Sequence, residues 1–340
     1  MKKLFLLLFA VFTLACGRTK VGSLPEPVTN NAVVALEKDN KTFIYSFFGL
    51  DSTKQWSGVH NKIFKIDLST GSSSFIGNVP DKFGRLAASA SVIRNKAYIV
   101  GGYAVFEDGK EKSSAHIFIF DPQTEKITVG ESIPVSIDDQ VQGVWRDSLL
   151  YVISGWSDSV NVNSVQVYNP FQDEWTLATP LPDEWDAKVF GGCGIIEGDT
   201  IYMLGGAMFE KFYPPSRSFY KGVINGNDPA SIDWIKSGEY PGEFRYRSAA
   251  FAEGGQIIFF GGSNETYNYN GISYAEKKPV EPNQNNLVYT ISTGQFSVKT
   301  GYPQVMDLRN VVRTRTGEWC VIGGMANQQK VSSDVSVISR

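Results

Sequence analysis

Short apolar and aromatic runs recur along the chain, and each of them ends in glycine. The six copies are Ile44–Gly49, Tyr98–Gly102, Tyr151–Gly155, Ile201–Gly206, Ile257–Gly262 and Trp319–Gly324. Their last glycines stand at positions 49, 102, 155, 206, 262 and 324, so the repeat advances in steps of 53, 53, 51, 56 and 62 residues. A period of this length built on β-prone segments is typical of a propeller or an array of β units.

A second mark, a polar strand that ends in proline, runs in phase with the glycines. The prolines stand at positions 25, 80, 134, 182, 241 and 303. Proline ends a strand because it lacks the N–H group that a ladder needs. Each proline precedes the next glycine by 21 to 24 residues, whereas the distance from a glycine to the following proline varies from 27 to 41 residues. One half of the unit is therefore nearly constant, and the other half takes up the insertions.

Each unit has the length and pattern of four strands joined by turn-forming residues. In the second unit these strands are expected at 87–93, 96–100, 117–121 and 126–129. The last unit reaches Arg340 after its third strand, and residues 20–25 match the fourth strand that it lacks. We therefore expect residues 20–25 to complete the last unit and close a ring, which leaves no unpaired edge.

The order of these elements resembles the kelch repeat. A first strand, an aromatic strand that runs into Gly-Gly, a third strand with a Tyr-Asp-Pro-like end and a Trp on the fourth strand follow one another, most clearly in Val167–Trp175. The resemblance extends over residues 20–340 and implies an all-β, six-bladed β-propeller of kelch type with four-stranded blades. Blades are expected to start near residues 30, 85, 140, 188, 247 and 309.

The first residues have the composition of an export signal. Lys2 and Lys3 precede the apolar stretch Leu4–Leu14, which is too short to span a membrane. The small residue before Cys16 resembles a bacterial lipobox, with Thr13 where Leu is usual. The resemblance implies a lipoprotein signal peptide over residues 1–15, lipidation of Cys16 and a lipid-anchored tether over residues 16–19. The expected location is the periplasm or the cell surface, with the outer membrane as the anchoring membrane; plain secretion is the alternative.

The charge, the cysteines and the metal-ligand patterns of the chain limit the partners and bound groups that we expect. Without residues 1–15 the chain has 30 basic and 35 acidic side chains, which argues against nucleic acid as a partner. Cys193 and Cys320 lie in units that are not neighbours in a ring, so we expect buried free thiols rather than a disulfide. No zinc or calcium spacing motif occurs, so no cofactor or metal is predicted. A monomer is expected.

One polar residue per unit aligns at the predicted mouth of the central channel. These residues are Asn31, Arg85, Gln140, Lys188, Arg247 and Arg309. Four of the six are cations, and guanidinium groups bind carboxylate or phosphate bidentately, so an acidic ligand such as an acidic sugar is one prediction. The alternative is that each cation pairs with a nearby acid and only solvates the rim. The acids close in sequence are Asp139, Asp186, Glu243 and Asp307.

The longest insertion, residues 262–287, lies on the same predicted face. Tyr267, Tyr269 and Tyr274 stand beside Asn268 and Asn270 in this loop. Tyrosine rings stack on sugar rings, and the amides hydrogen-bond hydroxyl groups, so the loop is a candidate glycan-binding element. The alternative is that these tyrosines only hold the long loop on the propeller.

Three functions fit this organisation. The first is non-catalytic binding of a glycan or a protein ligand through the Arg-rich mouth and the long loop, as the kelch resemblance implies. The second is a sugar mutarotase or epimerase, an isomerase, because the chain resembles exported kelch proteins that interconvert sialic-acid anomers in size, export signal and blade number. Candidate acid–base groups are Glu210, Glu243, Asp139 and Asp186. The third, least favoured, is a galactose-oxidase-like copper radical oxidase, for which the chain offers only His60 and His116 as histidine ligands.

Overall fold

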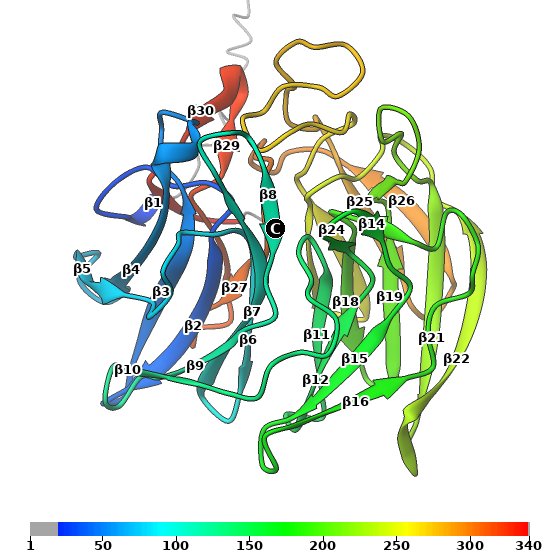
Figure 1. The fold of residues 1–340 in the computed structure, drawn as a ribbon, viewed down its shortest axis with the longest axis horizontal. Helices are drawn as coiled ribbons and strands as arrows, with labels where there is room; N and C mark the ends of the chain where they lie inside the picture. Colours follow the sequence, from blue (N-terminus) through cyan, green and yellow to red (C-terminus); the bar gives the residue numbers. More distant parts are fainter. Residues whose placement is uncertain (1–19, 339–340) are drawn as a thin grey trace, which may run out of the picture.

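Six four-stranded antiparallel sheets, arranged as blades, account for the six repeats (Figure 1). The structure is a computed structural model and describes residues 20–338. Blades 1 and 2 consist of β2 (Ala32–Lys38), β3 (Lys41–Leu50), β4 (Val59–Asp67) and β5 (Ser73–Asn78), and of β6 (Leu86–Ile93), β7 (Lys96–Val105), β9 (Ile117–Asp121) and β10 (Lys126–Val129). Blade 3 consists of β11 (Val141–Trp145), β12 (Leu149–Ile153), β15 (Val165–Asn169) and β16 (Glu174–Ala178).

The other three blades repeat this order. Blade 4 consists of β18 (Cys193–Glu197), β19 (Thr200–Leu204), β21 (Ser218–Asn225) and β22 (Asp228–Glu239). Blade 5 consists of β23 (Ala249–Glu253), β24 (Gln256–Phe260), β25 (Asn286–Thr290) and β26 (Gln295–Lys299). Blade 6 consists of β27 (Val312–Arg313), β28 (Trp319–Ile322), β31 (Asp334–Val337) and β1 (Lys20–Ser23). The predicted fold class, including ring closure by the N-terminal strand, is confirmed, because β1 pairs antiparallel with β31.

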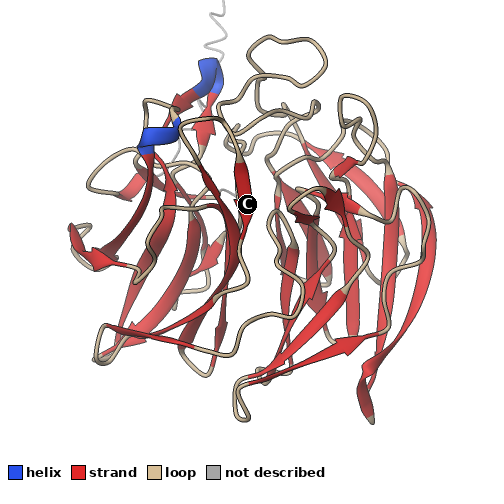
Figure 2. Ribbon diagram, viewed as in Figure 1, coloured by secondary structure: helices blue, strands red, loops and turns tan. Residues whose placement is uncertain are grey.

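Short extra elements decorate the loops that follow the second strands. β8 (Glu111–Ser113) extends blade 2, and two small hairpins pair β13 (Trp156–Ser157) with β14 (Val160–Asn161) and β29 (Met325–Ala326) with β30 (Lys330–Val331). In blade 4, β20 (Ala207–Met208) pairs with β17 (Val189–Phe190), which precedes the first strand of that blade. Two single 3₁₀ turns, η1 (Trp56–Gly58) and η2 (Asn327–Gln329), are the helical segments drawn in Figure 2. β8, β29, β30 and the 262–287 loop lie at the upper end of the view in Figure 1, so the insertions gather on one face.

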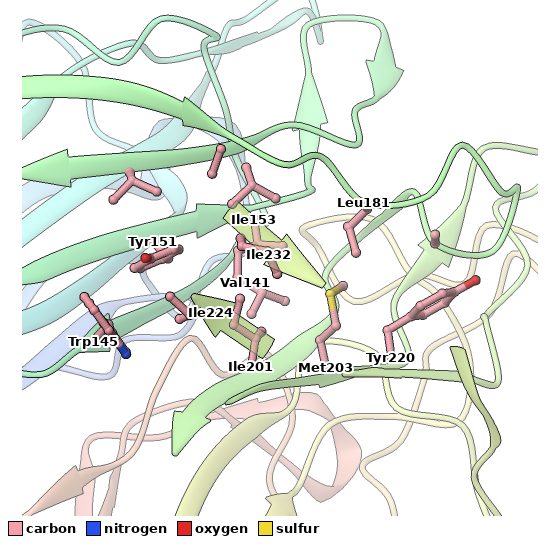
Figure 3. Close-up of a cluster of buried hydrophobic side chains, with 14 of the residues drawn as sticks. Val141, Trp145, Tyr151, Ile153, Leu181, Ile201, Met203, Tyr220, Ile224 and Ile232 are labelled. Atoms are coloured by element: carbon pink, nitrogen blue, oxygen red, sulfur yellow. The ribbon is translucent and has the colours of Figure 1, made fainter. Parts of the chain in front are cut away.

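The core lies between neighbouring blades, which explains why the second strands are continuously apolar. Along β12, Tyr151 and Ile153 pack toward blade 4, whereas Leu150 and Val152 pack toward blade 2. Successive side chains of a strand point to opposite faces, and here both faces are buried. Figure 3 shows one such interface, in which Ile153 of blade 3 lies near Ile201 and Met203 of blade 4.

The glycines that end the second strands make backbone contact with the next blade. The second glycine of each pair donates an N–H hydrogen bond to a carbonyl in the segment that leads into the neighbouring blade. The six donor–acceptor pairs are Gly49 to Arg85, Gly102 to Ile137, Gly155 to Val189, Gly206 to Arg245, Gly262 to Val305 and Gly324 to Val28, at 2.8–3.1 Å. The first glycine lies against the same carbonyl: a Cβ on Gly205, which has φ +69°, would stand 2.2 Å from the Arg245 oxygen.

We expect Gly205→Ala to destabilise the fold far more than Gly198→Ala. Both glycines have a left-handed φ, +69° and +60°, but a Cβ at Gly198 meets nothing within 4 Å. The control therefore carries only the conformational cost of about 1–2 kcal/mol, and the clash with the next blade adds about 1–3 kcal/mol at Gly205. Urea unfolding followed by circular dichroism measures both. Equal destabilisation of the two variants would contradict a packing role for the glycine pairs that end the second strands.

Candidate functional site

A closed ring of hydrogen bonds surrounds the propeller axis. Its members are one residue per blade, all with left-handed φ between 49° and 63°: Asn30, Ala87, Asp139, Gly191, Arg247 and Asp307. Five backbone N–H groups around the ring donate to the backbone carbonyl of a ring member. The donor–acceptor pairs are Asp139 to Ala87, Gly191 to Asp139, Arg247 to Gly191, Leu308 to Arg247 and Asn30 to Asp307. The Asn30 side-chain oxygen accepts from the Ala87 N–H at 2.6 Å and completes the circle.

This ring corrects the alignment made from sequence. Among the six aligned mouth residues, only Arg247 is a ring member. The other five stand one to three positions away. Four of the six ring positions hold Asn, Asp or Gly, the residues that adopt left-handed φ most readily. This preference is the sequence feature that could have located the ring.

The ring carries a buried ion-pair network across the axis. Arg247 of blade 5 contacts Asp139 of blade 3 at 2.6 Å and Asp307 of blade 6 at 3.2 Å. Arg309 contacts the same Asp139 at 2.5 Å. Burial alone would raise the pKa of Asp139, but Arg247 and Arg309 outweigh it and hold that pKa below its ordinary value. The two arginines are therefore brought together, but by carboxylates of the protein itself.

The remaining predicted mouth residues do not join this network. Arg85 pairs with Asp81, donates to the Gly101 carbonyl at 2.9 Å and contacts His116 at 2.8 Å. Three further contacts hold the others in place: Asn31 with Ser46 at 2.8 Å, Gln140 with the Val100 carbonyl at 3.0 Å, and Lys188 with Asp183 at 2.6 Å.

The 262–287 loop folds down onto the ring. Tyr267 is completely buried, its hydroxyl lies 3.4 Å from an Asp307 oxygen, and its ring centroid lies 5.1 Å from that of Tyr246. Tyr267 therefore holds the loop in place and presents no ring face for a sugar, contrary to its prediction as a stacking residue. Tyr269 is half-buried and packs against the cluster that contains Tyr103, whereas Tyr274 lines the axial pocket described next.

A pocket of about 140 Å³ lies over the ion-pair network, and we call it the axial pocket. Blades 2, 3, 4 and 5 contribute to its lining. The residues are Tyr103, Glu111, Asp138, Asp139, Trp156, Phe190, Tyr213, Arg247, Asn268 and Tyr274. Its aromatic rings pack edge to face: Phe190 lies 5.6 Å from Trp156 and 5.5 Å from Tyr213, and Tyr213 lies 4.9 Å from Tyr274.

Local structure explains how these side chains reach the axis. Tyr103 directly follows Gly101-Gly102 and Trp156 directly follows Ser154-Gly155, so both stand where the second strand reaches the mouth and both line the pocket. β8 pairs with the end of β7, with Glu111 opposite Val105. This pairing places Glu111 in the lining of the pocket. The sequence marked this face through its insertions, but it did not single out Trp156, Phe190, Tyr213, Glu111 or Asp138.

Two carboxyl groups of the axial pocket have raised pKa values. The surrounding protein partly desolvates the Glu111 carboxyl and raises its pKa to about 7, while the residue keeps an opening to solvent at the mouth. Burial and the neighbouring Asp139 charge raise the pKa of Asp138 well above its ordinary value, and Asp138 accepts a hydrogen bond from Ser113 at 2.5 Å. Two carboxyl groups with raised pKa values in one pocket are an arrangement suited to proton transfer.

Other predicted features remain away from this pocket. Burial lowers the pKa of His60 in β4 to about 4, and His116 lies beside Arg85. Cys193 and Cys320 are buried free thiols. Within residues 20–338, no three His, Cys, Asp or Glu side chains gather as a metal-ion site. The same part of the chain contains no helix long and apolar enough to cross a membrane. Cys16 and the predicted signal lie outside the described residues.

Comparison with known proteins identifies the repeat. Models of the kelch motif match residues 84–134 and 147–182. Kelch-like protein 25 of Xenopus tropicalis is 26% identical over 215 residues, which cover 60% of this chain and 33% of that protein. Kelch-like protein terF of Aspergillus terreus is 25% identical over 229 residues, 63% of this chain and 47% of that protein. The chain thus spans less than half the length of these curated relatives.

A solved structure supports the architecture over nearly the whole chain. The structure of YjhT superposes with a TM-score of 0.69 at 14% sequence identity, covering 94% of this chain and 96% of YjhT. At this identity the likeness shows the fold alone. The chain is a six-bladed β-propeller that carries kelch motifs.

Proposed function

We propose that the protein binds a glycan non-catalytically, with one sugar unit in the axial pocket. The convergence of aromatic rings and hydrogen-bonding groups from four blades carries this proposal. Aromatic side chains offer the apolar faces of a sugar ring a matching surface, and Glu111 and Asn268 stand where hydroxyl groups need partners. A rigid ring with variable loops on one face is a common basis for recognition.

The charge of the site favours a neutral sugar over an acidic one. Arg247 and Arg309 already pair with Asp139 and Asp307, so they have little capacity left for a ligand carboxylate. Glu111 and Asp138 add acidic groups to the same pocket. The acidic sugar that the alignment of cations suggested is therefore less favoured than a neutral one. A protein ligand remains the other kind of partner that fits a kelch propeller.

The proposed setting is the bacterial cell envelope. The residues around Cys16 support a lipid anchor in the outer membrane and export to the periplasm or cell surface, with the propeller as a monomer. This part of the proposal depends on the sequence of residues 1–19.

Trp156→Ala tests the binding site. Trp156 lies centrally in the pocket wall, with Phe190, Phe209 and Tyr213 each within 6 Å of its ring. We expect the variant to weaken sugar binding by about tenfold or more, since an aromatic contact contributes about 0.5–1.5 kcal/mol beyond its buried area. Isothermal titration against glucose, galactose, mannose and N-acetylglucosamine measures the effect. Phe171→Ala, an equally aromatic change in the turn between β15 and β16, is the control.

Unchanged affinity in Trp156→Ala would contradict the pocket as the binding site. Loss of binding in Phe171→Ala would point to another surface. Retention of binding by the control and its loss in Trp156→Ala would support the proposal.

A sugar mutarotase is the second candidate, and the carboxyl pair favours it. Ionised Glu111 is suited to take the proton of the anomeric hydroxyl while protonated Asp138 donates to the ring oxygen, as the ring C–O bond breaks and the open-chain carbonyl forms. The reverse proton transfers close the ring on the other face. The earlier acid–base candidates fit less well: Asp139 is committed to two arginines, and Asp186 pairs with Lys236.

The pH dependence of anomer exchange tests this candidate. A general base is active when ionised, so the catalysed rate should rise as pH increases through about 7, the pKa of Glu111. Glu111→Gln should lower the rate on the order of 10²-fold, and Glu107→Gln in the same hairpin should not. Proton NMR of freshly dissolved sugars with and without protein measures the rate. Equal rates in Glu111→Gln and the unmodified chain would leave non-catalytic binding as the function.

A further inference from the structure

We propose that exposed aromatic residues on blade 4 bind the second and following units of an oligosaccharide whose terminal unit occupies the axial pocket. The residues are Trp185, Phe209 and Phe212, and we call them the blade 4 platform. This inference rests on the proposed function, because it extends the same site from a single sugar to a chain.

The size of the axial pocket suits one end of a longer ligand. The pocket measures about 140 Å³, whereas sites that enclose a whole small ligand usually measure roughly 300–1,000 Å³. Further units of an oligosaccharide would lie on a surface that borders the pocket.

The blade 4 platform borders the pocket through a direct ring contact. The Phe209 ring lies 5.7 Å from the ring of Trp156, which forms part of the pocket wall. Phe209 is nevertheless 41% exposed, so aromatic surface continues from the pocket to solvent without interruption. Contiguous exposed apolar surface next to a pocket is a feature of ligand-binding grooves.

The loop that carries Phe209 and Phe212 is held in a strained conformation. Phe212 and Tyr213 have φ values of 68° and 51°, which bulky residues seldom adopt. Hydrogen bonds fix the loop: the Met208 N–H donates to Pro214 at 2.9 Å, and the Thr266 hydroxyl donates to the Tyr213 carbonyl at 2.6 Å. This conformation places Tyr213 in the pocket lining and leaves Phe212 48% exposed.

Trp185 completes the platform from the segment before blade 4. Its indole is 50% exposed, and its N–H donates to the carboxylate of Glu210 on the Phe209–Phe212 loop. The hydrogen bond orients the ring relative to that loop. Glu210 and Lys211 are exposed between the two phenylalanines, where they offer an acceptor and a donor for sugar hydroxyls.

A second aromatic pair, exposed Phe83 and half-buried Phe106, lies on blade 2 and serves as a control. Phe83 and Phe106 meet edge to face at 5.2 Å beside a groove of about 440 Å³. This groove has no lining residue in common with the axial pocket. Phe83 is 41% exposed, comparable to Phe209. The aromatic ring of Phe209 on blade 4 contacts the pocket wall, whereas the groove beside the blade 2 pair shares no lining residue with the pocket.

The test compares monosaccharides with their oligomers on the purified full chain. The probes are glucose with cellohexaose and maltohexaose, mannose with mannohexaose, and N-acetylglucosamine with chitohexaose, each titrated calorimetrically. We expect at least one hexasaccharide to bind roughly tenfold more tightly than its monomer, since two additional ring contacts contribute about 1–3 kcal/mol together. The double variant Trp185→Ala/Phe212→Ala should remove this difference and leave the monomer affinity within about twofold. Phe83→Ala/Phe106→Ala should leave both affinities unchanged.

The outcomes separate the platform from the pocket. A hexasaccharide that binds the blade 4 double variant as tightly as the unmodified chain would overturn the platform while leaving the pocket intact. Loss of the hexasaccharide preference in the blade 2 double variant alone would also overturn it, in favour of the other groove. Failure of every probe to bind would overturn the proposed function together with the platform.

Discussion

Six backbone hydrogen bonds between neighbouring blades set the geometry on which the rest of the molecule depends. Each runs from the glycine that ends a second strand to a carbonyl that leads into the next blade, and the bond from Gly324 to Val28 closes the circle. Blades 1 and 3 keep this contact although Phe48 and Ser154 replace the first glycine, and both residues adopt the left-handed φ that glycine would supply. Because the contact is made by backbone atoms, the angle between blades is insensitive to the side chains of the loops.

The axial ring is a consequence of that fixed angle, and it determines which chemistry the mouth can perform. Six left-handed residues meet at the axis, and the acids among them, Asp139 and Asp307, face Arg247 in a region without water access. A buried arginine without a partner would be strongly unfavourable, so each charge has to be neutralised from another blade. Arg247 and Arg309 are thus already paired with carboxylates of the protein. What remains for a ligand is the layer above it, where the loops bring aromatic rings and the carboxyls of Glu111 and Asp138.

The sequence predicted the fold well because the fold depends on a periodic backbone contact. Glycine pairs and prolines located six blades, and residues 20–25 were correctly assigned to the last one. The site was predicted less well for a physical reason: its contacts join residues far apart in the chain, such as Asp139 and Arg247, 108 positions apart. The segments before the inner strands also differ in detail, so five of the six aligned mouth residues stand one to three positions from the ring members. The burial of Tyr267 depends on how one long loop folds, and no repeat encodes it.

The division between backbone ring and loop layer also explains where specificity resides. A charged residue at the axis is hard to replace singly, because its partners come from other blades; Asp139 pairs with Arg247 of blade 5 and Arg309 of blade 6. Residues such as Trp156, Tyr213 and Phe209 come from loops whose ends are fixed by the ring but whose interiors contact mainly one another. A substitution there alters the shape of the recognition surface without disturbing the charge balance beneath it. The strained aromatic pair Phe212 and Tyr213 fits this division, since a rigid base can hold a loop in a conformation that the loop alone would not keep.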